Sequence, residues 1–312
     1  MVHFKICFIG IGSIARRHIR NIYKICKDQN IKVHIDALRR YNTFSDGIQN
    51  VYTDVDDVPS DYDAVFITNP TGLHLESLTN LYKKTKFFFI EKPLVSLQQI
   101  ARAYEYTDKF NSISYIACPL RYHPVIQFIK KNIEVNEVIS VRAISSSYLP
   151  EWRPDQDYRM SYSANKEMGG GVGIDLIHEW DYLTFLFGFP RKINYMHGKK
   201  SVLEINSDDY AVYLAEFEDK IAEVHLDYFG RKTIRKLELI TKEDTIIGDI
   251  VENKIDFLKQ NKTLCFDETR DDWHIKEIMH FLDIFFKKTA NDSSFTHALN
   301  VLNLSQGIIN NY

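Results

Sequence analysis

The sequence predicts an α/β protein that begins with a doubly wound parallel sheet and continues into an α+β domain with a largely antiparallel open sheet. Three observations lead to this prediction. Short apolar runs alternate with amphipathic segments over the first 120 residues, a glycine-rich turn joins the first run to the first amphipathic segment, and short charged turns join the later runs. The first pattern is typical of buried parallel strands between helices, and the last is typical of an antiparallel meander.

The change of rhythm near residue 120 divides the chain into a domain at 1–120 and a second domain at 121–312. In the first domain we expect strands at 3–10, 32–40, 61–69, 86–93 and 112–120, with helices at 13–28, 72–84 and 96–110 between them. In the second domain a helix at 124–132 and a strand at 137–148 precede a polar region at 150–173. The meander at 209–241 and two helical segments at 274–288 and 296–308 complete it.

Composition excludes several functional classes. The chain has 312 residues and a net charge of -3, with its basic residues interspersed among acids, so we expect no nucleic-acid partner. Its longest apolar runs, 87–90 and 182–189, fall short of the roughly 20 residues that span a bilayer, so we expect no membrane segment. Scattered cysteines and the absence of a visible signal peptide favour the cytoplasm and no metal site; these cysteines are Cys7, Cys26, Cys118 and Cys265.

The segment GIGSIA at 10–15 follows the first strand and opens the first helix. In such a motif Gly10 makes a tight turn, Gly12 lets a pyrophosphate approach the backbone, and Ala15 allows close packing of helix on strand. Ser13 is placed to cap the helix, whose N-terminus holds the phosphate charge. Its place at the start of the alternating pattern favours a dinucleotide-binding Rossmann domain over a plain turn.

The end of the second strand distinguishes two dinucleotides. An acid there bonds the ribose 2′-hydroxyl of NAD, whereas an arginine accommodates the 2′-phosphate of NADP. The run KVHIDALRR ends in Arg39 and Arg40, while Asp36 lies inside it. We therefore expect NADP or NAD as the cofactor, with NADP favoured, and two solvated arginines are the alternative interpretation.

Glu91, Lys92 and Pro93 follow a buried strand, at the edge where open α/β sheets bind their ligands. Three further motifs accompany them: TNPTGLH at 68–74, RYHP at 121–124 and GGGVGIDLIHEWD at 169–181. With the GIGSIA turn, these motifs make the sequence similar to the glucose-fructose oxidoreductase and inositol dehydrogenase family (Gfo/Idh/MocA). The motifs occur in the family's order over nearly all of the chain.

The resemblance implies a Rossmann domain followed by an α+β domain whose open sheet covers the active site and often forms a subunit interface. We accordingly expect a homo-oligomer, a dimer or tetramer, assembled through the C-terminal sheet. Lys92 matches the family's lysine beside the nicotinamide, and the peptide before Pro93 is typically cis in the family. The expected cofactor contacts are Gly10, Gly12, Ser13, Ile14, Arg39, Arg40, Asn69, Pro70, His74, Glu91 and Lys92. For His74, packing against or capping the helix expected at 72–84 is the alternative interpretation.

Glycines 169–171 permit backbone angles that other residues avoid and let the chain pass close to a ligand. At about 100° per residue, the helix expected after them has one polar face. That face carries Asp175, His178, Glu179 and Tyr182. Family members usually place a histidine four residues after the aspartate, where this chain has Glu179, with His178 one residue earlier. We assign the acid/base role to His178, with Lys92 polarising the substrate oxygen, Asp175 positioning both, and Glu179 as the rival.

The segment 145–168 is rich in aromatic and arginine side chains and is interpreted as a substrate lid, with a solvated loop as the alternative. Arginine offers a planar fork of donors to carboxylates and phosphates. The expected substrate contacts are Arg121, Arg153, Tyr158, Arg159 and Glu179.

These features predict an NAD(P)-dependent oxidoreductase that transfers a hydride between nicotinamide and a carbinol or keto carbon of a sugar or sugar derivative. The 145–168 segment is similar to that of family members associated with surface-polysaccharide and sialic-acid-like sugar synthesis, which extends the expected substrates to nucleotide- or phosphate-linked sugars. Two alternatives stay open. One is an epimerase, lyase or glycosidase that uses bound NAD transiently, and the other is a non-catalytic regulatory protein that binds cofactor and sugar.

Overall fold

The computed structural model describes residues 2–41 and 47–309, which form two compact units. The first unit extends to Pro119 and also contains Thr269–Leu299. The second unit contains Leu120–Glu268 and the chain from Asn300 onward. The sequence-based division near 120 assigned every later residue to the second domain, whereas Thr269–Leu299 returns to the first unit.

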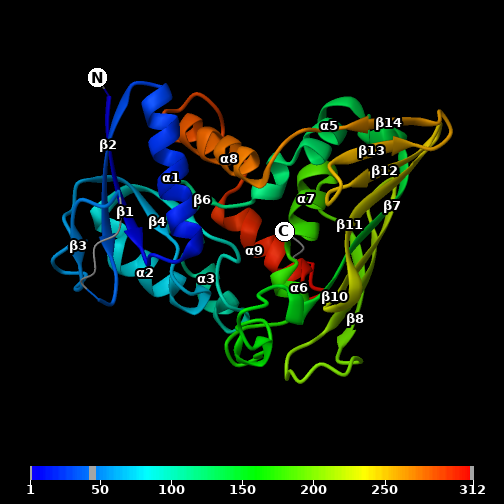
Figure 1. Ribbon diagram of the computed structural model, residues 1–312, viewed down its shortest axis with the longest axis horizontal. Helices are drawn as coiled ribbons and strands as arrows, with labels where there is room; N and C mark the ends of the chain where they lie inside the picture. Colours follow the sequence, from blue (N-terminus) through cyan, green and yellow to red (C-terminus); the bar gives the residue numbers. More distant parts are fainter. Residues whose placement is uncertain (1, 42–46, 310–312) are drawn as a thin grey trace. The chain divides into compact units, whose positions relative to one another are not determined.

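A six-stranded sheet, with all its strand pairs parallel, forms the centre of the first unit (Figure 1). Its order is β3-β2-β1-β4-β5-β6, which reverses direction between β1 and β4. Ligands of open α/β sheets bind outside the carboxyl ends of the strands at such a reversal. The strands are β1 (Val2–Ile9), β2 (Ile31–Leu38), β3 (Val51–Tyr52), β4 (Tyr62–Ile67), β5 (Thr85–Ile90) and β6 (Ser114–Ile116).

The helices of this unit confirm the predicted alternation and refine it. The first, α1 (Ser13–Asp28), has the predicted bounds. The helix expected at 72–84 consists of α2 (His74–Leu81) between two short 3-10 turns, and the one expected at 96–110 is divided into α3 (Ile100–Tyr104) and α4 (Thr107–Phe110).

A late helix, α8 (Arg270–Phe285), packs beside α1 in the first unit (Figure 1). Phe281 of α8 meets the ring of Phe89 edge-on with the centroids 5.2 Å apart, and Phe89 is stacked on Phe66. Two arginines of α1, Arg17 and Arg20, bind the carboxylate of Asp271. The apolar face of α8 therefore completes the core over the parallel sheet, which explains why this segment belongs to the first unit.

The second unit is built on an eight-stranded sheet in the order β14-β13-β12-β11-β7-β10-β9-β8. All of its pairings are antiparallel except β7 with β10, which confirms the expected largely antiparallel sheet. The meander expected at 209–241 is wrong in one respect, because β7 lies between β10 and β11 and, among the strands of that range, only β9 and β10 pair directly. Its strands are β7 (Val138–Tyr148), β8 (Lys192–Gly198), β9 (Tyr210–Glu216), β10 (Ile221–Asp227), β11 (Phe229–Thr241), β12 (Thr245–Asp249), β13 (Lys254–Phe257) and β14 (Lys262–Cys265).

Three helices lie on one face of the second sheet: α5 (Pro124–Asn132), α6 (Val172–Asp175) and α7 (His178–Phe187) (Figure 1). The last helix is α9 (Phe295–Leu304), and the division between the units falls within it. Across residues 2–41 and 47–309, no helix has both the length and the hydropathy needed to cross a membrane.

The burial of one histidine between α1 and α8 leads us to expect that the folded state loses stability in acid. His274 of α8 is 3% exposed, and its burial lowers its pKa to about 4. An unfolded chain returns this pKa to about 6.5, so below that pH the unfolded state binds a proton that the folded state excludes. Stability carried by neutral His274 is therefore present above pH 6.5 and is lost as the pH falls toward 4.

We expect the loss of unfolding free energy between pH 7 and pH 5 to be about 2 kcal/mol smaller in His274→Gln than in the natural chain, measured by urea unfolding. The exposed His3 supplies a control, because His3→Gln leaves His274 in place and should keep the natural pH dependence. Equal pH dependence in the His274 variant and the natural chain would contradict the prediction.

Candidate active site

The turn after β1 contains two glycines with different structural demands. Gly10 has a φ of +80°, and a Cβ there would lie 3.0 Å from the Cα of Asn69. Gly12 has an unstrained φ of -90°, and a Cβ there would meet nothing within 4 Å. The fold itself therefore requires Gly10, whereas Gly12 borders open space at the start of α1.

The prediction that Ser13 caps α1 is wrong. Gly12 is the N-cap, and Ser13 is the first helical residue, with no side chain capping this helix. The first turn carries no acidic side chain, so nothing in it opposes a bound anion. Backbone N–H groups at a helix N-terminus bind phosphate readily, and this end of α1 fits that role.

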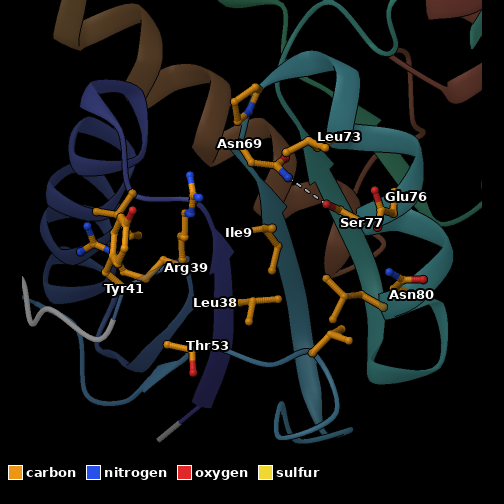
Figure 2. A pocket seen from close by; sticks show the side chains of 16 residues that line it. Ile9, Leu38, Arg39, Tyr41, Thr53, Asn69, Leu73, Glu76, Ser77 and Asn80 are labelled. Atoms are coloured by element: carbon orange, nitrogen blue, oxygen red, sulfur yellow. Dashed lines mark hydrogen bonds between the residues drawn. The ribbon is translucent and has the colours of Figure 1, made fainter.

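A pocket of about 650 Å³ lies at the carboxyl ends of β1, β2 and β4 and along α2 (Figure 2). It brings together some of the residues that the sequence predicted, namely Gly10, Arg39, Arg40, Asn69 and Pro70. The Asn69 amide donates to Ser77 Oγ at 2.9 Å across the pocket wall. Lining residues that the sequence did not single out include Tyr41, Thr53, Leu73, Glu76, Ser77 and Asn80.

The end of β2 supports the sequence-based choice between its acid and its arginines. The strand ends at Leu38, and Arg39 and Arg40 follow it into the pocket wall. Asp36 is inside the strand and 1% exposed, where it accepts hydrogen bonds from Tyr62 Oη at 2.7 Å and from the Asn50 amide at 2.8 Å. Asp36 is therefore engaged in the core, while the two arginines line the pocket.

The other residues predicted for the cofactor lie outside the lining of this pocket. Gly12, Ser13 and Ile14 are at the start of α1, where Gly12 and Ser13 are exposed. Glu91 and Lys92 follow β5 and are half-buried, and the Lys92–Pro93 peptide is cis, as predicted. His74 is buried at the start of α2.

Glu91 is tied to α1 through a buried imidazole. His18 is 0% exposed, and its Nε2–H donates to Glu91 Oε1 at 2.6 Å. Burial acts against ionisation of Glu91, but the hydrogen bond and charge of His18, with smaller effects of His274 and Lys92, hold the pKa of Glu91 below its ordinary value. The Glu91 carboxylate therefore accepts the hydrogen bond from His18.

His74 lies between the backbones of two loops. Its Nε2 is 2.9 Å from the Asn69 carbonyl oxygen and its Nδ1 is 3.1 Å from the Leu94 carbonyl oxygen. Both carbonyls only accept hydrogen bonds, so a neutral ring satisfies one of them and a protonated ring satisfies both. Burial nevertheless lowers the pKa of His74. The side chain thus links the loop after β4 to the loop after β5.

In the second unit, the triple glycine packs against the loop that precedes it. Gly169 and Gly171 have φ values of +88° and +138°. A Cβ on Gly170 would collide with the carbonyl oxygen of Tyr162. The glycines are therefore needed where two backbone segments of this unit approach each other.

The helix expected after the glycines is broken, and its predicted polar face is partly wrong. Helix α6 ends at Asp175, and α7 begins at His178 after a two-residue interruption. Glu179 and Tyr182 are both 0% exposed and do not belong to an exposed face. From Gly169 to Thr184, a stretch described in full, every residue is buried except Asp175 and His178.

Two ion pairs hold α7, one buried and one with a half-buried arginine. Arg235 of β11 donates from Nε to Glu179 Oε1 at 2.7 Å. Arg121 donates from Nε and Nη2 to the two oxygens of Asp181 at 2.9 Å and 2.6 Å, and its own exposure is 1%. Glu179 and Arg121, both predicted to contact substrate, are thus occupied by partners inside the fold, and we do not carry them into the proposed site.

Asp175 has a partner that sequence reasoning missed. The hydroxyl of Tyr228 donates to Asp175 Oδ2 at 2.5 Å, and Tyr228 is 0% exposed. Burial and the adjacent Asp175 carboxylate raise the pKa of Tyr228 well above its ordinary value, so the phenol keeps its proton. The strand pattern contained Tyr228, but alternation alone did not give the face on which its side chain lies.

In the predicted substrate loop, two of the three residues expected to contact substrate already bind other groups of the protein. Arg159 is held by Asp157 and by Glu204, whose Oε2 is 3.0 Å from Arg159 Nη1. The hydroxyl of Tyr158 accepts from the backbone N–H of Glu204 at 3.1 Å. Arg153 is exposed. The carboxylates beside Arg159 compete with any anion that would bind it.

Two family models match the chain. The model described as oxidoreductase family, NAD-binding Rossmann fold, matches residues 4–117, and the model of the GFO/IDH/MocA C-terminal domain matches residues 126–247. An uncharacterized oxidoreductase of Bacillus subtilis is 26% identical over 222 residues, which are 68% of this chain and 63% of that protein. A myo-inositol 2-dehydrogenase of Thermotoga maritima is 26% identical over 192 residues, 59% of this chain and 55% of that protein. The matches thus span less than two thirds of these relatives' length.

Solved structures show the same fold over nearly the whole chain. Levoglucosan dehydrogenase in complex with NADH has a TM-score of 0.83 at 16% identity, with 98% of this chain and 96% of that chain covered. A UDP-N-acetylglucosamine 3-dehydrogenase from Acidithiobacillus ferrooxidans has a TM-score of 0.74 at 17% identity, with the same coverage. With the two family models matching more than half of its length, the chain belongs to the Gfo/Idh/MocA family of NAD-binding oxidoreductases.

Proposed function

We propose that this protein is a dehydrogenase that prefers NADP and transfers a hydride between its nicotinamide and a carbinol or keto carbon of a sugar or sugar derivative. The relatives named as acting on inositol and levoglucosan support a polyhydroxylated substrate. Nucleotide- or phosphate-linked sugars, a homo-oligomeric assembly and a cytoplasmic location stay predictions.

The observation that carries the proposal is the partial exposure of Asp175 and His178 in a segment whose other residues are buried. The neighbouring acids Glu179 and Asp181 are buried and neutralised by Arg235 and Arg121, so they are poor candidates for proton transfer. Oxidation of a carbinol requires a base that takes the hydroxyl proton as the hydride leaves. We assign this step to His178, because an imidazole accepts a proton near neutral pH.

Asp175 and Lys92 complete the proposed site. The hydrogen bond from Tyr228 fixes the Asp175 carboxylate, which orients the substrate hydroxyl and His178. Lys92 donates to the substrate oxygen and stabilises the negative charge that develops on it. A bound nicotinamide dinucleotide supplies the hydride acceptor. That Lys92 and His178 serve the same reacting carbon is part of the proposal.

The preference for NADP is inferred from the end of β2. Arg39 and Arg40 enter the wall of the pocket, and the nearest acid of that strand, Asp36, is engaged by Tyr62 and Asn50. A 2′-phosphate placed beside these arginines gains charge-assisted hydrogen bonds, whereas the carboxylate of β2 that could accept from a ribose hydroxyl is already engaged in the core.

The glycine turn gives a paired test of cofactor binding. Gly12→Ala should keep the natural melting temperature, because its φ is unstrained and no atom lies within 4 Å of the added Cβ, while its affinity for NADPH falls at least about tenfold. Gly10→Ala should instead destabilise the fold by about 1–3 kcal/mol, because φ is +80° and Asn69 is in contact. Natural NADPH affinity in Gly12→Ala would argue against dinucleotide binding at this turn.

Cofactor choice is tested by removing each arginine. Arg39→Ala and Arg40→Ala should weaken NADPH binding about 10- to 100-fold relative to NADH, since each charge-assisted hydrogen bond contributes about 1.5–3 kcal/mol. The control Arg102→Ala removes the same charge from an exposed position on α3. An unchanged ratio of the two dissociation constants, measured by titration calorimetry, would remove the NADP preference.

The catalytic assignment is tested by measuring turnover of a panel of cyclitols, sugars and amino sugars, with the absorbance of NADPH as the signal. On the substrate that is turned over, His178→Asn should lose roughly 10²- to 10⁴-fold in turnover with little change in cofactor affinity. His197→Asn, at an exposed histidine of the same unit, is the control and should retain turnover. Full turnover by the His178 variant would transfer the role to another group.

A further inference from the structure

We propose that two buried histidines, His18 and His74, fix the chain on either side of Lys92 and are positioning residues for it. The proposal rests on the catalytic role given to Lys92 in the proposed function. It assigns to His18 a part that sequence reasoning did not foresee, and it gives His74 a structural role in place of a direct cofactor contact.

The first of these two contacts, here called anchors, joins Glu91, the residue before Lys92, to α1. His18 lies among the aromatic rings under the sheet, with its ring centroid 5.1 Å from that of Phe89, and none of its surface is exposed. Its Nε2–H donates to the Glu91 carboxylate at 2.6 Å, a short charge-assisted hydrogen bond. Glu91 also donates its backbone N–H to the Ile67 carbonyl at 3.0 Å, so both its backbone and its side chain are held.

The second anchor joins the other side of the segment to the pocket. His74 is 1% exposed and contacts the carbonyl oxygen of Leu94, two residues after Lys92. The opposite nitrogen of the same ring contacts the carbonyl oxygen of Asn69, which lines the pocket. The position of the Lys92 backbone is therefore tied to the loop that borders the proposed cofactor site.

Anchors on both sides matter because lysine is a flexible side chain that carries a point charge. Catalytic groups lose on the order of 10²-fold in rate when they are misplaced by about 1 Å. The Glu91 carboxylate adds a charge next to Lys92. Glu91 itself interacts with His18 of α1 and, more weakly, with His274 of α8, whose own charged neighbours include Arg17. Release of Glu91 from His18 should therefore change both the place and the electrostatic surroundings of the Lys92 ammonium.

The experiment measures Lys92 directly in the full-length protein without cofactor. Lysines are labelled by reductive ¹³C-methylation, and the Lys92 signal is identified by its absence from Lys92→Arg. We expect His18→Phe to shift the position and titration midpoint of this signal, because phenylalanine fills the space but cannot donate to Glu91. His18→Gln should restore much of the natural signal, because its amide nitrogen can replace Nε2 as the donor.

A matched control comes from the same buried cluster. His274 is 3% exposed and its ring centroid is 5.9 Å from that of His18. His274→Gln disturbs this core without removing the hydrogen bond to Glu91, so the Lys92 signal should keep its natural position. A natural Lys92 signal in folded His18→Phe overturns the proposal, as does an equal shift in the His274 control.

Turnover is a second, independent measurement that tests whether His18 positions Lys92. His18→Phe should lose on the order of 10²-fold in turnover while KM and NADPH affinity stay near natural values, and His18→Gln should recover most of the loss.

If His18→Phe does not fold, Glu91→Ala breaks the same link from its half-buried end, and natural turnover in that variant overturns the proposal. Because the lysine signal is read without substrate or cofactor, an unchanged signal refutes the anchoring, whereas a shifted signal in a protein without dehydrogenase activity refutes the proposed function alone.

Discussion

Two arginine–carboxylate pairs hold α7 and engage the acids that follow His178 in its first turn. Arg235 neutralises Glu179 and Arg121 neutralises Asp181; Glu179, Arg121 and Asp181 are buried, whereas the Arg235 side chain is 21% exposed. Removing one partner of such a pair leaves an uncompensated buried charge, which costs about 3–5 kcal/mol. The pairs therefore fix the orientation of α7, and they leave Asp175 and His178 as the accessible ionisable residues of the Gly169–Thr184 segment.

The first unit shows the same division between structural and available groups. Asp36, an acid near the place where NAD-binding members of such folds use one, is held in the core by Tyr62 and Asn50, and the arginines that follow β2 line the pocket. Likewise, Glu91 is engaged by His18, whereas Gly12 borders open space at the start of α1. In both units, local ion pairs and hydrogen bonds engage these acids within the fold. Asp175 of the proposed site is likewise held by a hydrogen bond, from Tyr228.

The sequence predicted the features that depend on short-range patterns. The strand, glycine turn and helix over residues 2–28 and the cis peptide at Pro93 were confirmed because each depends on adjacent residues or on motif resemblance. Features that depend on distant partners were missed. Helical periodicity placed Glu179 on a polar face with Asp175 and His178, but its partner Arg235 lies 56 residues away. The hydroxyl that binds Asp175 comes from Tyr228, 53 residues away. The amphipathic pattern of α8 likewise predicted a helix without indicating which sheet it covers.

The proposed function requires Lys92 and His178 to act on one reacting carbon. A crystal structure of the protein bound to NADP⁺ and a substrate found in the panel measures this directly. We expect Lys92 Nζ and a ring nitrogen of His178 both to lie within about 3.5 Å of the same substrate oxygen, whose carbon faces C4 of the nicotinamide. A complex in which either group lies beyond hydrogen-bonding reach of that oxygen would contradict it.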